Sequence, residues 1–221
     1  MAEKKDSFDE IALHRRSIRR YDETVDIPPG EMIEMLEMAT TAPSSSNMQP
    51  WRFVVVDRPQ IKEKLLPNVQ FNIGPVGTAA AVIAIFGDLE GADNAEDIMR
   101  KTDELRSRTA GDKTTPPRPP IPKGKTPGEM VRGMYAAMTR EQKMSIAQID
   151  CGLVAMQLMQ AARVFGYDTV PLGAYDRQAV AKELYMDEER YIPIMLLAMG
   201  KAAEGGMPPF RLPVAEVAKF I

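Results

Sequence analysis

The chain is short of the residues that most often carry catalysis. It holds one cysteine, Cys151, and one histidine, His14, in 221 residues. A lone cysteine excludes an internal disulfide and a cysteine metal cluster within one chain. Zinc sites built on several His or Cys ligands are excluded too, and a Ser-His-Asp triad would need His14. If the protein is an enzyme, we expect a bound organic cofactor to supply the reactive group.

Charge and hydropathy exclude further classes of protein. The 28 Lys and Arg against 31 Asp and Glu give a formal net charge of −3, which argues against a nucleic-acid partner bound through a basic field. No apolar run approaches the roughly 18 to 20 residues of a membrane span, and the N-terminus leads into no apolar signal core. We therefore expect a cytoplasmic protein with no membrane partner.

Helix-like and strand-like segments alternate along the chain. Ser7 and Glu10 form a capping box, which predicts a helix ending near residues 15–17. Apolar runs predict buried strands over 53–56, 79–86 and 191–199, and a strand edge or loop over 169–173. Helical spacing predicts helices over about 29–41, 58–66, 91–108, 128–165 and 177–186. No GxGxxG or P-loop pattern is present, so a dinucleotide-binding Rossmann domain has no support.

The longest helical stretch, 128–165, is apolar around much of its circumference. Such a helix is buried in a core or in a subunit interface. Cys151 lies in this helix and is interpreted as a small core hydrophobe rather than a redox thiol.

A basic run near the N-terminus is the first candidate site. Residues 15–20 read Arg-Arg-Ser-Ile-Arg-Arg, four guanidinium groups and a hydroxyl in six residues. Guanidinium forks suit phosphate oxygens, so the run fits an anion site. A solvated basic helix end explains the same charges. The residues alone leave both interpretations open, and His14 beside them is expected to be structural or solvent-facing.

A polar loop before the first strand is the second candidate. Residues 42–53 read Ala-Pro-Ser-Ser-Ser-Asn-Met-Gln-Pro-Trp-Arg-Phe and include the only tryptophan. Backbone amides, hydroxyls and side-chain amides there could cradle a planar heterocycle, since strand-end loops often carry binding groups. An ordinary polar turn with Trp51 as a core anchor fits equally well.

Together these motifs resemble the FMN-dependent nitroreductase superfamily. The basic run, the polar loop, Gln148-Ile-Asp-Cys-Gly-Leu, Val170-Pro-Leu-Gly and Arg211-Leu-Pro all match its pattern, over nearly the whole chain except about 104–130. The resemblance implies a single α+β domain over 1–221, with a mainly antiparallel sheet flanked by helices. It also implies an intertwined homodimer with two FMN sites at the interface.

The resemblance carries roles to matching positions. It places Arg15, Arg16, Ser17 and Arg19 at the FMN phosphate and ring edge, and Arg211 closing on the phosphate. Asn72 would face the flavin pyrimidine, with Pro171, Leu172 and Gly173 beside the reactive N5. Pro43, Ser44, Ser45 and Asn47 would contact the flavin from the other subunit. No side chain is assigned as catalytic and no metal is expected, because the flavin carries the electrons.

The implied activity is FMN-dependent oxidoreduction. NAD(P)H would reduce the flavin, leave, and be replaced by a small-molecule electron acceptor such as a nitroaromatic or quinone, in a ping-pong cycle. Reductive dehalogenation, dehydrogenation and flavin fragmentation use the same scaffold, so they stay open. A non-enzymatic flavin-binding or sensing protein also stays open, because the basic residue that the family often has after the Asn72 position is absent.

The stretch 105–127 departs most from the family pattern. It is rich in proline and basic residues, so we expect no regular element there. We interpret it as an insertion that forms a basic lid over the flavin and selects anionic substrates. A surface excursion without a role, or a polyproline ligand for a partner domain, are the alternatives.

Overall fold

The protein is an α+β domain built on one antiparallel sheet. The computed structural model describes residues 8–108 and 120–221. The sheet has four strands in the order β1-β2-β4-β3, and each neighbouring pair is antiparallel. The strands are β1 (Trp51–Val56), β2 (Ala81–Asp88), β3 (Asp168–Leu172) and β4 (Tyr191–Gly200). The expected α+β fold class is confirmed, and of residues 169–173 all but Gly173 belong to β3.

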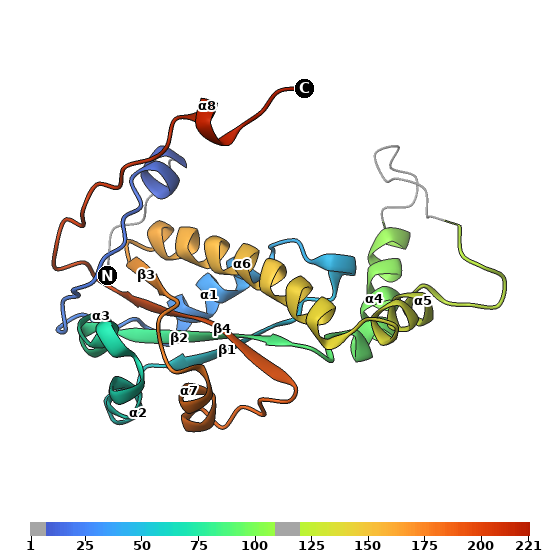
Figure 1. Ribbon diagram of the computed structural model, residues 1–221, viewed down its shortest axis with the longest axis horizontal. Coiled ribbons are helices and arrows are strands. Elements are labelled where there is room, and N and C mark those ends of the chain that lie inside the picture. Colours follow the sequence, from blue (N-terminus) through green and yellow to red (C-terminus); the bar gives the residue numbers. More distant parts are fainter. Residues whose placement is uncertain (1–7, 109–119) are drawn as a thin grey trace.

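The two faces of the sheet are covered by different helices (Figure 1). Alternate residues of β2 point to opposite faces, as the two-residue period of a strand requires. Ile83 and Ile85 pack with α1 (Pro29–Thr40) and α6 (Arg140–Val164). Val82 and Phe86 pack with α2 (Pro59–Leu65), α3 (Ile73–Thr78) and α7 (Arg177–Glu183). Both faces of β2 and of most of β4 are therefore buried, which explains their continuous apolar sequence.

The first strand does not match the expectation of burial on both faces. Trp51 and Val56 are buried, but the four residues between them are half-buried. β1 pairs only with β2, so one of its edges is open within this chain. The β-branched run predicted the strand correctly but not its position at the edge of the sheet.

The stretch predicted as one helix over 128–165 is two helices. α5 (Pro127–Ala136) ends before Met138, and α6 begins at Arg140. Thr139 caps α6 by accepting a hydrogen bond from the Gln142 backbone amide, and the Gln142 side chain accepts one from the Thr139 amide. This capping box starts a new helix inside a continuous helical pattern. α5 packs on α4 (Ala95–Arg108) as a hairpin at one end of the molecule (Figure 1).

The proline-rich stretch is only partly described. Residues 105–108 form the last turn of α4, so the expectation of no regular element is wrong for that part. Residues 109–119 lie outside the described residues. Thr126 caps α5 through a second capping box with Glu129. The lid interpretation stays a prediction.

The N-terminal helix is shorter than expected. Ser7, the predicted cap, lies outside the described residues, and the helical turn covers Asp9–Leu13 with π-type hydrogen bonding. Phe8 is 69% exposed rather than packed on the core.

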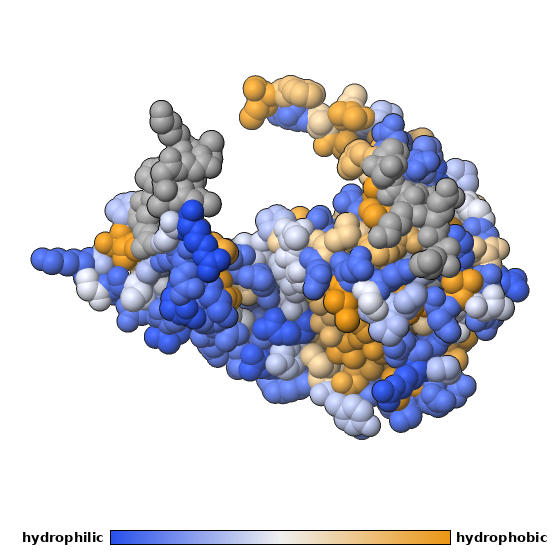
Figure 2. Space-filling view, turned by 180° about the vertical axis from the view of Figure 1, so that it is seen from behind, coloured by the Kyte–Doolittle hydropathy of each residue, from blue (hydrophilic) through white to orange (hydrophobic). Residues whose placement is uncertain are grey.

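The C-terminal segment extends away from the body after β4. Residues 201–204 run antiparallel to residues 20–22, with Asp22 N donating to Lys201 O and Ala203 N to Arg20 O. From Gly205 to Ile221 the chain is mostly extended, with α8 (Val214–Val217) as a single turn. Figure 2 shows this arm as a largely apolar strip that stands clear of the body. Phe210 and Phe220 are 81% and 91% exposed.

Within the described ranges, none of the helices is long and apolar enough to span a bilayer.

Candidate functional site

The basic run lies as an extended segment against the start of β3. Ile18 is buried at 3% exposure, and its amide donates to the Thr169 carbonyl at 3.2 Å. Since side chains of an extended segment alternate, Ser17 and Arg19 face away from the core on which Ile18 packs. Arg16 lies half-buried, and its Nη1 donates to the carbonyls of Leu13 and Arg15. The guanidinium of Arg16 is therefore engaged with its own backbone.

Arg15 stands in a group of cations. Burial lowers the pKa of Arg15, and so do the neighbouring charges of Arg211, Arg16 and Arg163, while Asp168 opposes them. The Nη1 atom of Arg15 is buried and has no hydrogen-bond partner among the described residues. A buried donor without an acceptor is rare and costly, so this atom marks a place where a ligand oxygen fits. Because four guanidinium groups cluster here, they favour a ligand that is negatively charged.

The C-terminal segment returns to this cluster before it leaves the body. A Cβ on Gly206, whose φ is +66°, would lie 2.8 Å from Cβ of Arg16, so the segment packs directly on the basic run. Glu204 Oε1 accepts a hydrogen bond from the Arg19 amide at 2.7 Å. These contacts bring Arg211 to Arg15, residues that are 196 positions apart in the sequence.

The residues predicted to lie beside the flavin ring, Asn72 and 171–173, border the region of the basic run. The Asn72 side-chain amide donates to the Ala174 carbonyl at 2.8 Å, which ties it to the chain just after Gly173. Leu172 is buried, whereas a Cβ on Gly173 would meet nothing within 4 Å. Gly74 lies beside the Arg19 carbonyl. Asn72, residues 171–173 and the basic run therefore line one continuous side of the domain.

The polar loop belongs to a different part of the chain. The Ser45 amide donates to both carboxylate oxygens of Asp150, at 3.1 and 3.0 Å, and Ser45 Oγ donates to Oδ1 at 3.2 Å. The hydroxyl of Tyr135 donates to the Ser45 carbonyl at 3.4 Å. Burial raises the pKa of Asp150, and the hydrogen bonds from Ser45 oppose that rise. The loop is thus held by α5 and by the middle of α6.

Backbone conformation gives the loop a fixed shape. Ser46, Asn47 and Gln49 have φ of 52°, 57° and 49°, in the left-handed region that costs most residues energy. Ser44 Oγ accepts the Gln49 amide at 3.0 Å. A loop that holds three such residues at a strand entry is preorganised, which is typical of a binding site.

The two halves of the predicted site do not meet within one chain. Asp150 anchors the polar loop, and Arg163 lies in the cationic cluster at the end of the same helix. The two residues are 13 positions apart on α6, which corresponds to about 20 Å along the helix axis. The arginine half and the loop half are therefore separate surfaces of the chain.

Sequence reasoning missed three polar residues that support these surfaces. Asp150 and Arg163 are almost fully buried on α6, at 1% and 7% exposure, and Asp168 pairs with Arg163 at 2.5 Å. The available signal was a charged residue among apolar ones in a helix that was expected to be buried. Charged side chains are almost never buried without partners, so such a residue indicates a polar contact.

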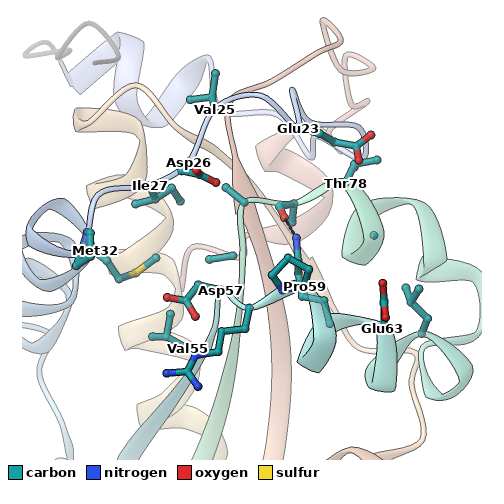
Figure 3. A pocket seen from close by; sticks show the side chains of 18 of the residues that line it. Glu23, Val25, Asp26, Ile27, Met32, Val55, Asp57, Pro59, Glu63 and Thr78 are labelled. Atoms are coloured by element: carbon teal, nitrogen blue, oxygen red, sulfur yellow. Dashed lines mark hydrogen bonds between the residues drawn. The ribbon is translucent and has the colours of Figure 1, made fainter.

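A groove of about 900 Å³ opens at the C-terminal end of β1, between residues 23–36, α2 and the segment that leads into β2 (Figure 3). Its apolar wall includes Val55 and Met32, and its rim carries the carboxylates of Asp26, Asp57 and Glu63. None of the residues that the sequence singled out lines it.

Comparison with known proteins agrees with this fold, an antiparallel α+β domain of the nitroreductase class. The model of the Nitroreductase family matches residues 12–201, and the chain belongs to that family.

Similar proteins cover the whole chain. YdgI of Bacillus subtilis (strain 168), provisionally named an NAD(P)H nitroreductase, is 45% identical over 98% of this chain and 99% of its own length. A crystal structure of a provisionally named nitroreductase from Exiguobacterium sibiricum 255-15, in complex with FMN, is 39% identical with a TM-score of 0.87 and covers 100% of both chains. The CLA biosynthesis enone reductase of Lactiplantibacillus plantarum is 34% identical over 88% of this chain and 85% of its own length.

Proposed function

We propose that the protein is an FMN-dependent oxidoreductase that uses NAD(P)H as electron donor. The observation that carries the proposal is the buried, unpartnered Nη1 of Arg15 amid three further guanidinium groups. A dianionic phosphate satisfies such a donor and neutralises such a cluster. The names of the relatives support the same cofactor and donor.

The residues present fit FMN from its phosphate to its ring. Arg15, Ser17, Arg19 and Arg211 would hold the phosphate, and Arg16 would keep the run in place through its bonds to Leu13 and Arg15. Asn72 would hold the pyrimidine edge, beside the chain at Pro171, Leu172 and Gly173. The absence of a Cβ at Gly173 leaves its backbone open to a close neighbour. Bound FMN supplies hydride transfer, accepting from NAD(P)H and giving to the acceptor in turn.

The second half of the site would come from another copy of the chain. The loop residues Pro43, Ser44, Ser45 and Asn47 lie on a surface separate from the arginine cluster, so a flavin bound at the cluster would contact the loop of a partner. α6 exposes Ile149, Leu153 and Met156, which are three or four positions apart and therefore share one side of the helix. A homodimer would bury that apolar side and complete two sites.

The C-terminal arm supports an intertwined form of this dimer. The ten residues from Leu212 to Ile221, beyond Arg211, can span about 33 Å when extended. A second copy's arm could pair with the open edge of β1 and place its apolar end in the adjacent groove (Figure 3). Lys219 would then meet the carboxylates on the groove's rim.

We propose that the reaction takes place in the cytoplasm, where the donor NAD(P)H is available. Donor and acceptor would enter the same opening in turn. The acceptor class is the finer part of the proposal: nitroaromatics and quinones come first, and the enone reductase among the relatives makes conjugated ketones the second class to test.

Mass spectrometry of the chromophore released from the purified protein tests the cofactor. We expect FMN, bound without a covalent link, at about one per chain. FAD, or no flavin after reconstitution, would exclude the proposal. Stopped-flow mixing with NADH and NADPH, followed by a nitroaromatic, a quinone and an enone, then ranks donors and acceptors. A flavin that no donor reduces would favour a binding or sensing protein instead.

A further inference from the structure

Arg163 is a buried charge that the fold alone does not require. It lies in the last turn of α6 and is 7% exposed. A cation near a helix C-terminus is favourable when exposed to solvent, so burial adds a desolvation cost that the helix dipole does not explain. Its Nε atom is buried and has no partner among the described residues.

The other two nitrogens of Arg163 hold the segment that carries the basic run. Nη2 donates to the Glu10 carbonyl at 3.0 Å, at the start of that segment. Nη1 bonds Oδ1 of Asp168 at 2.5 Å, and the next residue, Thr169, accepts the amide of Ile18. One side chain thus fixes the N-terminal segment at Glu10 directly and at Ile18 through β3.

The charge of Arg163 also acts on the cluster. It is close enough to Arg15 to disfavour the charged form of that residue. Two neighbouring guanidinium groups, Arg15 and Arg163, each keep one buried nitrogen without an acceptor. Nη1 of Arg163 pairs with Asp168, so an anion at Arg15 would satisfy the unpartnered nitrogen of Arg15 and offset the positive charge that remains in the cluster.

We propose that Arg163 is a positioning residue for the phosphate of FMN: it orders the segment Glu10–Ile18 through Glu10 and Asp168 and adds positive charge behind Arg15. It acts without contacting the cofactor. The inference rests on the proposed function, since it needs a phosphate at Arg15.

Riboflavin separates this role from a merely structural one, because it carries the same ring and lacks the phosphate. The test compares FMN and riboflavin titrations of the apo form of the full-length wild type, Arg163→Met, Arg163→Lys and Asp168→Asn. Arg140→Met is the matched control: Arg140 lies at the other end of α6 and also donates to backbone carbonyls, those of Glu188 and Glu189.

We expect Arg163→Met to weaken FMN binding about tenfold or more, because the charge-assisted contacts that order the segment and the charge behind Arg15 are lost together, and to leave riboflavin binding within about twofold. Its FMN affinity should also depend less on salt. Arg163→Lys, which keeps the charge, should recover part of the loss. Asp168→Asn should change FMN affinity with riboflavin unchanged, because it alters both the anchoring of Arg163 and the charge beside Arg15. Arg140→Met should match the wild type for both ligands.

Equal losses for FMN and riboflavin would overturn the inference and leave a structural role. Unchanged FMN binding by Arg163→Met would overturn it as well, with the proposed function intact. A wild type that binds neither ligand would overturn the proposed function itself. If Arg163→Met does not fold, Arg163→Lys and Asp168→Asn decide, because a difference confined to FMN supports the role and equal effects on both ligands refute it.

Discussion

At the scale of single residues, the cationic cluster lowers the stability of the fold and favours the binding of an anion. An unsatisfied buried donor costs about 1–3 kcal/mol, more when it is charged, and Arg15 and Arg163 each have one. Total stabilities of such domains are about 5–15 kcal/mol, so this cost is a sizeable fraction. The fold holds both groups in place, which preorganises the cluster for a negatively charged ligand.

Arg15→Met should separate the effect of the cluster on stability from its effect on FMN binding. The change removes a buried donor and keeps an unbranched side chain, so the apo protein should unfold at the same urea concentration or higher. FMN affinity should fall about 10- to 150-fold, the effect of losing a charge-assisted contact. Isothermal titration and urea unfolding measure both quantities.

Arg211→Ala is the partner experiment, because Arg211 is exposed and contributes little to the fold. Its FMN affinity should fall by a similar factor at unchanged stability. Arg140→Ala is the control, since Arg140 lies at the start of α6, where it donates to the carbonyls of Glu188 and Glu189, away from the cluster. Wild-type affinity in both Arg15→Met and Arg211→Ala would mean that the phosphate binds elsewhere.

The thiol of Cys151 should be unreactive in the folded protein. It is fully buried on α6, and burial raises the pKa of its thiol to about 12. Only the thiolate reacts with iodoacetamide, so alkylation at pH 8 should be far slower than that of free cysteine. Mass spectrometry should show one modification per chain after unfolding in urea. Rapid modification without urea would show that the interior of α6 opens.

At the scale of elements, apolar periodicity predicts where helices and strands lie better than where they end. The runs 79–86 and 191–199 became β2 and β4 almost unchanged, because strands buried on both faces leave an unbroken apolar pattern. The break at 137–139 was missed because α5 and α6 are both helical and only a capping box separates them. The available signal was the polar run from Thr139 to Lys143, in which Thr139 and Gln142 have the spacing of a capping box.

The site was predictable only in part for a similar reason. The resemblance to the family pointed to Arg15, Ser45 and Arg211. Asp150 and Arg163 act through residues that are distant in sequence: Ser45 lies 105 positions from Asp150, and Glu10 lies 153 positions from Arg163. Such pairs depend on the packing of the whole domain, which a single sequence does not display.

Thr139→Ala should test the helix break. Loss of an N-cap costs about 0.5–2 kcal/mol, so the free energy of unfolding should fall by about 1 kcal/mol. Thr102→Ala is the control within α4, where the hydroxyl only donates to the Ile98 carbonyl one turn before and alanine favours helix. Urea unfolding of both variants measures the difference, and equal stabilities would mean that the cap is dispensable.

Removal of the C-terminal arm tests its role in the dimer. A chain that ends at Pro213 keeps Arg211 and loses Val214–Ile221, whose apolar residues are exposed in the single chain. The body of the domain should fold as before, while the dimer should dissociate at higher concentration than full-length protein. Sedimentation velocity over a dilution series measures this. An unchanged dissociation constant would exclude the arm from the interface.

At the scale of the whole molecule, the proposed site consists of two halves on separate surfaces of the chain. Each half is rigid by itself: the arginine half through Arg163 and Glu204, the loop half through Asp150 and its left-handed residues. Two halves of one binding site on different surfaces are expected when two identical chains associate with two-fold symmetry. Each chain then supplies the arginine half of one site and the loop half of the other.

Mixed dimers provide the decisive test of this shared site. One variant, Arg15→Met with Arg211→Ala, lacks the arginine half. The other, Ser44→Ala with Asn47→Gly, lacks the loop half, and glycine keeps the positive φ that Asn47 needs. Each homodimer should bind FMN weakly. Refolding both variants together at equal amounts should give mixed dimers in which one site is intact and the other is doubly defective. Random association predicts that about one quarter of all sites regain wild-type affinity. If the site instead lay within one chain, mixing would restore none, since every chain would still carry its own defect.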